Sequence, residues 1–340
     1  MRFNKIVQIG NREVGHGRPV FIIAEAGVNH FGSFKKAIDL VDLAVDSGAD
    51  AFKIQVFKTN ELISKESSEW RTRLKSKELT YDEIAKVKEY CDKRSTIFLA
   101  TGHEELSVDF LDSLNIPAFK IGSGEVNNWP YIQHVARKGK PVILSTGMYT
   151  LGEVKIALKQ IQKEGNNNVV VLHCVTRYPA QPEEINLRAM DLLREKFKLP
   201  VGYSDHTEGW QIPLAAATRD ACVIEKHITL DFNIPNAQDW KVSCGPDDFP
   251  QFIKAVRLIE KALGKHEKKP SESEVESKKW ARKSLVAKVS IPVGTTITRE
   301  MLCSKRPGTG ISPELIIKVI GKTANKKIKV DNLIKWEDIS

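Results

Sequence analysis

The stretch Val20-Phe21-Ile22-Ile23-Ala24-Glu25 is a short apolar run that ends in a carboxylate, and an amphipathic segment over residues 35–47 follows it. In that segment Ile38, Val41 and Val45 recur at helical spacing, which predicts a helix with one buried face. A strand followed by a helix is the repeating unit of parallel sheets and of barrels. The number of such units therefore decides which of these folds the chain adopts.

The strand–helix unit recurs eight times over roughly 250 residues, the usual size of a (β/α)₈ TIM barrel. Apolar runs predict strands at 20–24, 51–56, 96–100, 118–121, 141–144, 169–172, 200–202 and 222–225. Amphipathic segments predict helices at 35–47, 81–93, 153–163, 186–196 and 249–263. An open doubly wound sheet is the alternative, but no glycine-rich dinucleotide-binding turn follows the first strand. We therefore expect an α/β protein with a TIM barrel.

The chain changes character after the last predicted helix. Residues 265–282 are rich in Lys, Glu and Ser, which is typical of a linker. Residues 283–340 contain short β-like runs at 285–289, 295–298 and 327–330, separated by turns rich in Pro and Gly. We expect a catalytic barrel over residues 1–264 and a small β-rich domain over 283–340. A domain of that size is marginal alone, so we expect it to pack on the barrel or on a partner subunit.

Composition narrows the class of protein. The net charge of +9 comes from Lys and Arg residues that are spread along the 340-residue chain among Asp and Glu, without a nucleic-acid-binding motif. The five cysteines have no paired spacing, no apolar run approaches the roughly 20 residues of a membrane span, and the N-terminus lacks a signal-peptide core. We expect a cytoplasmic protein with no nucleic-acid or membrane partner, whose basic charge serves an acidic small molecule or a solvated surface.

Each predicted strand is followed by ionisable or hydroxyl-bearing residues. In chain order these are Glu25, Lys53, Gln55, Thr101, His103, Lys120, Ser123, Glu125, Ser145, Thr146, His173, Thr176, Arg177, Tyr178, Tyr203, Ser204, Asp205, His206, Thr207, Glu225, Lys226 and His227. The C-terminal ends of barrel strands carry the chemistry in this fold. Because buried polar groups are costly unless they are used or paired, the set predicts one active site at the barrel mouth.

Two histidines at this mouth suggest a metal. His206 and His227 end neighbouring strands, so their rings can converge on one cation, with carboxylate or water oxygens completing the shell. The alternative is two unrelated histidines, one packed and one exposed, and spacing alone leaves both readings open.

Two lysines at the same mouth suggest an anion. Lys53 and Lys120 lie on non-adjacent strands and could hold a phosphate as point charges. The alternative is a pair of salt bridges to Glu25 or Glu125. Glu25 is a candidate general base, or else a structural acceptor for Lys53.

Several of these segments resemble those of the bacterial sialic acid synthase family, whose members end in an antifreeze-like (SAF) domain. In the barrel they are Ile23-Ala24-Glu25-Ala26-Gly27-Val28-Asn29-His30, Phe119-Lys120-Ile121-Gly122-Ser123-Gly124-Glu125, Ser145-Thr146-Gly147-Met148, Gly202-Tyr203-Ser204-Asp205-His206-Thr207 and Glu225-Lys226-His227. In the tail they are Arg282-Lys283-Ser284-Leu285-Val286-Ala287 and Lys305-Arg306-Pro307. The resemblance covers nearly the whole chain, with the motifs in order and in both domains.

The resemblance implies an activity. The family condenses phosphoenolpyruvate with an N-acetylated hexosamine, such as N-acetylmannosamine or a 2,4-diacetamido sugar, and releases phosphate. The product is a nine-carbon sialic-type acid, such as N-acetylneuraminate, legionaminate or pseudaminate. The resemblance also implies a divalent cation, Mn²⁺ first, with Mg²⁺ and Co²⁺ as alternatives, and a domain-swapped homodimer.

Roles carry over position by position from the same resemblance. It implies His206 and His227 as metal ligands. Around phosphoenolpyruvate it implies Lys53, Thr101, Lys120, Ser123, Ser204 and His206, and on the sugar side Gln55, Glu125, Tyr178 and Asp239. Glu25 would take part in the proton chemistry, and Glu25, Lys120 and Arg306 would be the catalytic residues. Arg306 would reach from the antifreeze-like domain into the other subunit's barrel.

The chain departs from the family pattern on the acceptor side. Thr176 stands where an Asn is common, Gly102-His103 replaces a Pro-Phe-like pair, and Trp240 stands where a His is expected. A synthase with another acceptor, such as mannose or a sugar phosphate held by Arg177, is therefore the alternative within enzymes. A non-catalytic scaffold whose antifreeze-like module binds carbohydrate or ice is the second alternative, and the crowded polar mouth argues against it.

Overall fold

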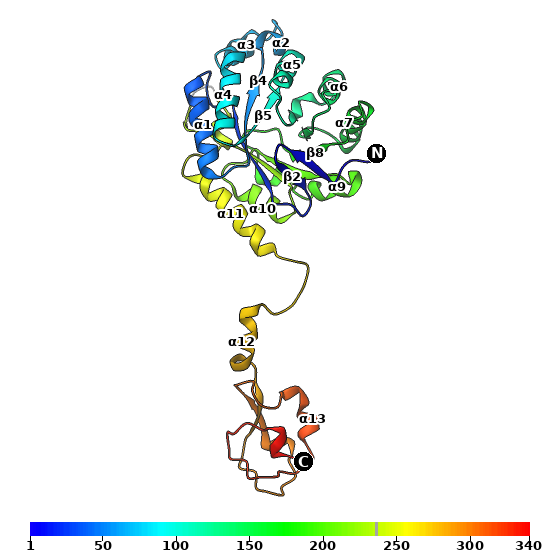
Figure 1. Cartoon of the computed structure of the whole chain (residues 1–340), viewed down its shortest axis with the longest axis vertical. Coiled ribbons are helices and arrows are strands. Elements are labelled where there is room, and N and C mark those ends of the chain that lie inside the picture. The colour runs from blue at the N-terminus through cyan, green and yellow to red at the C-terminus, as the bar shows by residue number, and fades with distance from the viewer. Residues whose placement is uncertain (235–236) are drawn as a thin grey trace. The chain divides into compact units, whose positions relative to one another are not determined.

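The computed structural model describes residues 1–234 and 237–340, which form two compact units, Met1–Gly264 and Lys265–Ser340. The first unit is a closed barrel of eight parallel strands, which confirms the predicted fold (Figure 1). Its strands are β3 (Phe21–Gly27), β4 (Ala51–Val56), β5 (Ile97–Gly102), β6 (Phe119–Ile121), β7 (Val142–Ser145), β8 (Val169–Cys174), β9 (Val201–Asp205) and β10 (Val223–His227). Strand β10 pairs with β3 and so closes the ring.

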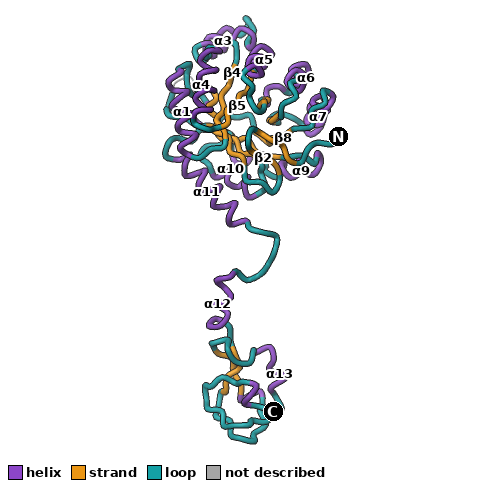
Figure 2. Tube along the Cα trace, in the orientation of Figure 1, coloured by secondary structure: helices purple, strands orange, loops and turns teal. Residues whose placement is uncertain are grey.

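Helices surround the ring of strands (Figure 2). They are α1 (Phe34–Ser47), α2 (Thr59–Leu62), α3 (Ser68–Lys75), α4 (Tyr81–Lys93), α5 (Glu105–Ser113), α6 (Trp129–Arg137), α7 (Leu151–Lys163), α8 (Pro182–Ile185), α9 (Ala189–Phe197), α10 (Gln211–Thr218) and α11 (Asp248–Leu263). Local signals set their ends. Thr150 and Glu153 form a capping box at the start of α7, and Gly48 takes a left-handed conformation just after α1. No helix among the described residues is long and apolar enough to cross a membrane.

An N-terminal hairpin closes one end of the barrel. Strands β1 (Ile6–Ile9) and β2 (Arg12–Gly15) pair antiparallel, and Val7, Ile9 and Val14 are fully buried. They pack with apolar residues at the N-terminal ends of the barrel strands, such as Phe21 and Leu99. Apolar side chains fill this end of the barrel, so we expect a substrate cavity at the C-terminal ends of the strands.

The last two barrel strands are longer than the sequence predicted. The predicted strands 200–202 and 222–225 continue to Asp205 and His227. Their polar residues end the apolar run, but the backbone ladder continues, with His227 opposite Glu25. The inward side chains at these positions therefore sit on strands, which hold them more rigidly than loops.

The second unit has its own apolar core, which includes Leu285, Ile297 and Ile334. Strands β11 (Ser284–Ala287) and β12 (Leu302–Lys305) pair antiparallel. The runs at 295–298 and 327–330 form no strands in this described unit, contrary to prediction; each contributes only an isolated bridge. Short 3₁₀ turns and α13 (Ile316–Val319) complete the unit.

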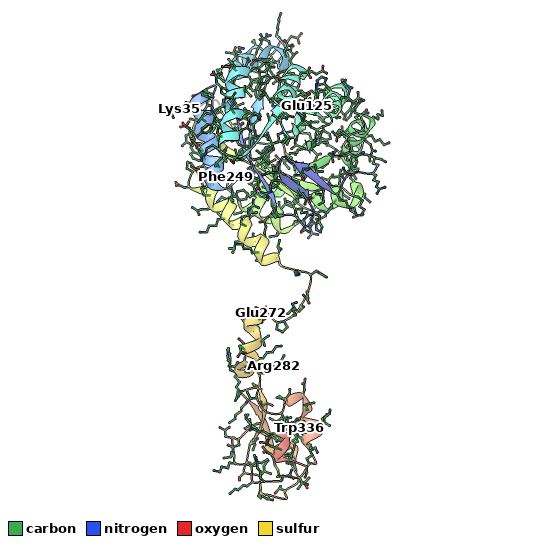
Figure 3. The ribbon with its side chains drawn as sticks, in the orientation of Figure 1. Lys35, Glu125, Phe249, Glu272, Arg282 and Trp336 are labelled. Carbon is green, nitrogen blue, oxygen red and sulfur yellow. The ribbon has the colours of Figure 1, made fainter. Side chains whose placement is uncertain are left out.

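A helix occupies much of the predicted linker. Helix α12 (Glu272–Ala281) begins at Ser271, whose side chain and Glu274 form a capping box. Figure 3 labels Glu272 at its start and Arg282 just past its end. The linker composition that we took as irregular therefore includes a capped, exposed helix.

Candidate active site

A cavity of about 140 Å³ opens at the C-terminal ends of the barrel strands. Its lining residues are Glu25, Lys53, Gln55, Thr101, His103, Lys120, Gly122, Ser123, Gly124, Ser145, Cys174, Thr176, Tyr178, Ser204, His206, Glu225 and His227. Of the residues to which we gave a site role, all except Glu125, Asp239 and Arg306 are in this wall. In the wider set of strand-end residues the prediction was wrong for seven that do not line the cavity: Thr146, His173, Arg177, Tyr203, Asp205, Thr207 and Lys226. The mouth of the barrel is thus lined mainly by ionisable and hydroxyl-bearing groups, as the strand ends predicted.

Four buried charged groups form the floor of the cavity. Lys53 forms a short ion pair with Glu25, and its Nζ lies 3.5 Å from Glu225 Oε2. Lys120 Nζ lies 3.3 Å from Glu225 Oε1, which also accepts a hydrogen bond from Ser204 Oγ at 2.9 Å. Each of the four charged side chains is at most 5% exposed. Buried charges are stable only when paired in this way, so the four form one coupled group.

The two carboxylates differ in their proton affinity. Burial, the largest influence, raises the pKa of Glu25 above its ordinary value, although Lys53 opposes it. Burial also acts to raise the pKa of Glu225, but Lys120 and Lys53 outweigh it and hold that pKa at about 2. Burial lowers the pKa of Lys120. Glu225 is therefore a fixed anion, whereas Glu25 is the carboxyl group better suited to take up a proton.

The two histidines face one another across the end of the barrel. The ring centroids of His206 and His227 are 5.5 Å apart. Nδ1 of His206 lies 2.7 Å from the carbonyl oxygen of Val175, so this nitrogen carries the hydrogen and the lone pair is on Nε2. Nδ1 of His227 is buried without a hydrogen-bond partner among the described residues. Burial and the neighbouring His206 lower the pKa of His227 well below its usual value, which keeps that imidazole neutral.

Tyr178 covers the histidine pair. Its ring stacks on that of His206, with 4.1 Å between centroids, and meets His227 edge-on at 5.8 Å. Its hydroxyl lies 2.8 Å from His206 Nε2. Cys174 Sγ lies 3.5 Å from His206 Nδ1 on the other side. The imidazole of His206 is thus held from several directions.

Glu125, Asp239 and Arg306 lie outside the cavity wall. Glu125, labelled in Figure 3, is 9% exposed and accepts a hydrogen bond from Asn128 at 2.7 Å, so it is not the partner of either lysine. Asp239 is close to the histidines: a Cβ placed on Gly27 would lie 2.7 Å from Asp239 Oδ2 and 3.1 Å from His227 Cε1. Gly27 is therefore required there, because its missing side chain makes room for both groups.

Arg306 belongs to the second unit. Its Nε donates a hydrogen bond to the carbonyl oxygen of Ala281 at 3.0 Å. Its guanidinium carbon lies 5.7 Å from the centroid of the Trp280 ring. Helix α12 thus orients the arginine, which is a contact that the sequence did not predict.

Glu225 is the important site residue that we placed at the mouth from the sequence without giving it a role. It precedes His227 by two positions on one strand, and side chains two apart on a strand point to the same side. That period alone would have placed it in the cavity beside the predicted metal ligand. Its pairing with both lysines depends on the barrel register, which the sequence does not contain.

Two of the three departures from the family pattern line the cavity, and the third does not. Thr176 lines the cavity, and a Cβ on Gly147 would lie 2.2 Å from its Oγ1, so a glycine at 147 makes space for it. His103 also lines the cavity. The indole nitrogen of Trp240 donates to the carbonyl oxygen of Ile234 at 3.1 Å. Asn236, beside this loop, lies outside the described residues.

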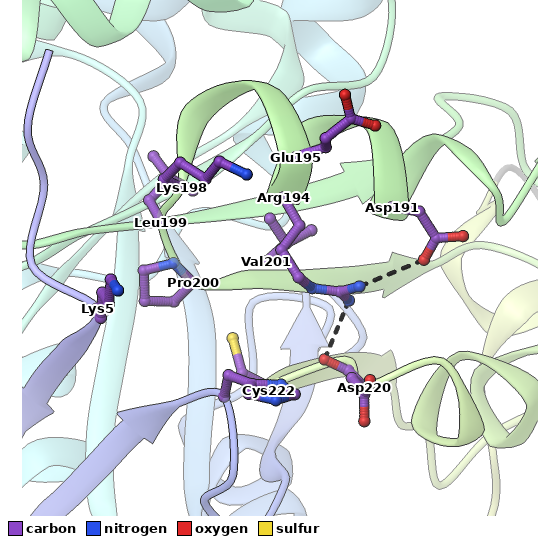
Figure 4. Close-up of a pocket in the computed structure, with 11 residues that line it drawn as sticks. Lys5, Asp191, Arg194, Glu195, Lys198, Leu199, Pro200, Val201, Asp220 and Cys222 are labelled. Atoms are coloured by element: carbon purple, nitrogen blue, oxygen red, sulfur yellow. Dashed lines mark hydrogen bonds and ion pairs between the residues drawn. The ribbon is translucent and has the colours of Figure 1, made fainter.

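A larger cavity, of about 420 Å³, lies between α9 and the N-terminal ends of β9 and β10. Its wall includes Leu199, Pro200 and Val201, with Arg194 at its edge. Figure 4 shows Arg194 engaged with Asp191 and with the carbonyl oxygen of Asp220, both at 3.3 Å. Arg194 is thus paired within the wall, and the cavity lacks the convergent lysines and histidines of the mouth.

Comparison with known proteins assigns both units. The sequence model of the NeuB family matches residues 40–268, and that of the SAF domain matches residues 282–340. Both matches follow the order of the two compact units.

Curated relatives cover almost the full chain. An N,N'-diacetyllegionaminic acid synthase of Campylobacter jejuni is 41% identical over 94% of this chain and 99% of its own. The human N-acetylneuraminate-9-phosphate synthase is 36% identical over 96% of this chain and 94% of its own. Among solved structures, the N-acetylneuraminic acid synthetase of Leptospira borgpetersenii in complex with citrate has a TM-score of 0.76 and 33% identity, covering 81% of this chain and 96% of that one.

Proposed function

The chain belongs to the NeuB family of sialic-acid-type synthases, and from that premise we propose that it condenses phosphoenolpyruvate with an N-acetylated hexosamine and releases phosphate. The acceptor is N-acetylmannosamine or a related 2,4-diacetamido sugar, and the product is a nine-carbon sialic-type acid. The observation that carries this proposal is the cavity in which two buried lysines lie beside two inward-facing imidazoles. Sequence similarity to synthases and the many ionisable side chains at the barrel mouth both argue against the non-catalytic scaffold.

Phosphoenolpyruvate binds at the lysine end of the cavity in this proposal. Lys53 and Lys120 supply positive charge to its phosphate and carboxylate, and the hydroxyl groups of Thr101, Ser123 and Ser204 add hydrogen bonds. Lys53 Nζ already lies 3.2 Å from Thr101 Oγ1. Holding both substrates in line lowers the barrier by orientation, an effect worth several kcal/mol.

The chemistry then needs one carbon–carbon bond, one water and one leaving phosphate. The enol carbon of phosphoenolpyruvate bonds to the aldehyde carbon of the open-chain sugar, whose oxygen gains a proton. Water adds to the carbon that bears the phosphate group, and the bond from that carbon to the phosphate oxygen breaks. Glu25, whose raised pKa suits proton uptake, accepts the proton that the water loses and passes it to the sugar oxygen. The hydroxyl group left on the phosphate-bearing carbon gives its proton to the departing phosphate as the ketone forms.

The histidines fit a divalent cation. His227 Nδ1 is a buried nitrogen without a partner in the described structure, and His206 Nε2, which accepts a hydrogen bond from the Tyr178 hydroxyl at 2.8 Å, is the second candidate ligand atom. No group of three or more His, Cys, Asp or Glu side chains among the described residues is arranged for a metal, so two imidazoles are what the protein offers. We propose His206 and His227 as ligands of Mn²⁺, with Mg²⁺ and Co²⁺ as alternatives. Such a cation supplies Lewis acidity to the sugar aldehyde.

The sugar lies on the side of Gln55, Tyr178, Glu125 and Asp239 in this proposal. Burial raises the pKa of both Glu125 and Asp239, which suits carboxyl groups that bind hydroxyls. A sugar phosphate is the less favoured acceptor, although the human relative carries a phosphorylated product in its name. Arg177, the cation that we considered for a phosphate, is bound to Glu184 at 2.6 Å.

One assay tests the proposal. Purified protein with Mn²⁺ and phosphoenolpyruvate is incubated with N-acetylmannosamine, a 2,4-diacetamido hexose, mannose or a 6-phosphorylated hexosamine, and phosphate release is followed. We expect release only with an N-acetylated, unphosphorylated sugar. The His227→Ala variant is the matched control and should release none. If no sugar stimulates release, the proposed function is wrong.

A further inference from the structure

The outer face of β9 and β10 carries a buried ion pair that the cavity does not use. Asp205 and Lys226 are both fully buried, and Lys226 Nζ lies 2.6 Å from Asp205 Oδ2. They are register partners on the neighbouring strands. Each directly precedes one of the two cavity histidines, and successive side chains on a strand point to opposite faces. The pair therefore lies behind the histidines, on the side that faces the helices.

The pair is the centre of a hydrogen-bond network that fixes the turn after β9. Asp205 Oδ1 accepts from Tyr203 OH at 2.9 Å and from Thr207 Oγ1 at 2.9 Å. Lys226 Nζ also donates to the carbonyl oxygen of Thr207 at 2.8 Å. Thr207 is the residue after His206, so the backbone of His206 is fastened on both sides to strand β10.

Stability alone is a poor explanation for these charges. Taking two ions out of water costs several kcal/mol each, and replacing a buried ion pair by uncharged residues of similar volume is often neutral or stabilising. What the pair provides instead is a fixed registration between the turn that carries His206 and the strand that carries His227. Groups that fix the orientation of metal-binding histidines strengthen metal binding. The hydrogen bonds to the His206 ring come from Tyr178, Cys174 and the Val175 carbonyl, so the ion pair acts on the rings through the backbone that carries them.

We propose that Asp205 and Lys226 are positioning residues that set the orientation and separation of the His206 and His227 rings, and that they act on cation binding through this. The inference rests on the proposed function for the cation. Neither residue of this fully buried pair contacts a substrate in this proposal; both act through the histidines.

The decisive variant removes both charges together. Asp205→Asn/Lys226→Met leaves no lone buried charge and keeps an acceptor for Tyr203, so we expect the double variant to fold with a thermal midpoint near that of the unaltered protein. Calorimetric titration of Mn²⁺ into the metal-free protein should show an affinity about tenfold weaker. Nitrogen NMR of the His206 ring should show a mixture of tautomers, where the unaltered protein has its hydrogen on Nδ1.

A second variant covers the case in which the double variant fails to fold. Thr207→Val keeps both charges and the side-chain shape but removes the hydroxyl that donates to Asp205. We expect it to fold and to weaken Mn²⁺ binding by a smaller factor. The matched control is Arg257→Met, which breaks the Arg257–Asp50 pair (2.7 Å) near the opposite end of the barrel and should lower stability without changing Mn²⁺ affinity.

The outcomes separate this inference from the proposed function. Unchanged Mn²⁺ affinity in a folded double variant, or in a folded Thr207→Val variant if the double one does not fold, overturns the positioning role. If the unaltered protein binds no Mn²⁺, the proposed function fails. In that case the His206 tautomer decides the positioning role alone: a mixture in the variant supports it, and an unchanged spectrum overturns it.

Discussion

At the scale of single residues, Glu225 joins the two lysines of the cavity into one group. It is the carboxylate that pairs with Lys120 in the described part of the chain, whereas Lys53 also pairs with Glu25. The Glu225→Gln variant therefore leaves a buried ammonium group without a counter-charge. We expect the free energy of unfolding to fall by about 3 kcal/mol at neutral pH. Denaturant unfolding monitored by circular dichroism measures this.

The same variant tests whether the lysines hold the anionic substrate. A ligand that binds the folded state stabilises it, and phosphoenolpyruvate would restore the missing negative charge. Saturating phosphoenolpyruvate should therefore raise the thermal midpoint of Glu225→Gln more than that of the unaltered protein. Asp39→Asn, which breaks a surface pair with Lys35, is the control and should change stability by less than about 1 kcal/mol. An equal shift in all three proteins would contradict the lysine site.

The buried His30 should make the free energy of unfolding depend on pH. It is 1% exposed, its Nε2 has no partner among the described residues, and burial lowers its pKa to about 4. In the unfolded chain a histidine has a pKa of about 6.5, so the unfolded state takes up the proton first as pH falls. The stability that neutral His30 contributes is complete above about pH 6.5 and is lost towards pH 4, roughly 3 kcal/mol in all.

The His30→Asn variant should therefore lose less stability than the unaltered protein between pH 7 and pH 4.5. Urea unfolding at several pH values measures the difference. His16→Asn, at an exposed position, is the control and should follow the unaltered protein. Parallel pH profiles for all three proteins would show that His30 is not the group responsible.

Many site residues were predictable because they lie in or just after an apolar run, and the barrel brings the inward-facing positions of such runs to one mouth. Outward-facing neighbours such as Asp205 and Lys226 were not separated from them. Lys53, His206 and His227 were placed on this ground, and they line the cavity. What the sequence did not contain was the register. The pairing of Lys53 with Glu25 was one of the alternatives that the sequence left open, and the structure shows it. The pairing of Glu225 with Lys120 depends on how the strands are staggered, which is a property of the closed sheet.

At the scale of elements, the strand ends were the least predictable part of the barrel. An apolar run in the sequence ends where the inward side chains become polar. Strands β9 and β10 continue past this point because their backbone groups still pair with the neighbouring strands. The N-terminal hairpin was also missed, since four-residue strands give a weak alternation signal. Helices were better predicted: α4 begins and ends where the periodicity indicated.

The C-terminal end of α12 supports the loop that carries Arg306. Gly308 N donates to the carbonyl oxygen of Lys279 at 2.8 Å, and a Cβ on Gly308 would lie 2.7 Å from Arg282 Cβ. Free carbonyl groups at a helix end attract donors and positive charge, so Arg306 suits this position. We predict that Gly308→Ala moves the loop away from the helix and, on the proposed role of Arg306, lowers kcat about tenfold or more.

Initial-rate kinetics with the best acceptor measure this effect. Val289→Ala, at an exposed position of the same unit, should leave kcat unchanged. Limited proteolysis of both variants shows whether the second unit remains folded. Normal turnover by a Gly308→Ala protein that is folded would mean that the loop geometry does not matter to the reaction.

At the scale of the whole molecule, the chain has two units with separate cores, and α12 belongs to the second. The barrel holds every cavity residue, while Arg306 lies in the second unit. An arginine on a separate unit can serve its own barrel or that of a second subunit. We propose the second arrangement, a domain-swapped homodimer, and a stable, active monomer in light scattering would exclude it.

Mixing two inactive variants distinguishes the arrangements. His227→Ala destroys the barrel site and keeps Arg306, and Arg306→Ala does the reverse. In a swapped dimer the mixed pair has one complete site, because the intact barrel receives the intact arginine from its neighbour. Half of randomly formed dimers are mixed, so co-refolding equal amounts should restore about a quarter of the full activity. If each arginine serves its own barrel, no dimer contains a complete site and activity stays at background.

A second mixture is expected to lose activity where the first gains it. Incomplete refolding cannot raise activity in the first mixture, so the two results together identify the arrangement. The His227→Ala/Arg306→Ala double variant is mixed with an equal amount of unaltered protein. In a swapped dimer every mixed pair is inactive, because its intact barrel is completed by the unit that carries Arg306→Ala. About a quarter of the activity of the same total amount of unaltered protein therefore remains. In an unswapped dimer each unaltered chain works alone, and about half remains. If the first mixture recovers activity and the second falls to a quarter, the arginine acts across the subunit boundary. If the first mixture stays at background activity and the second keeps one half, the arginine acts within its own chain.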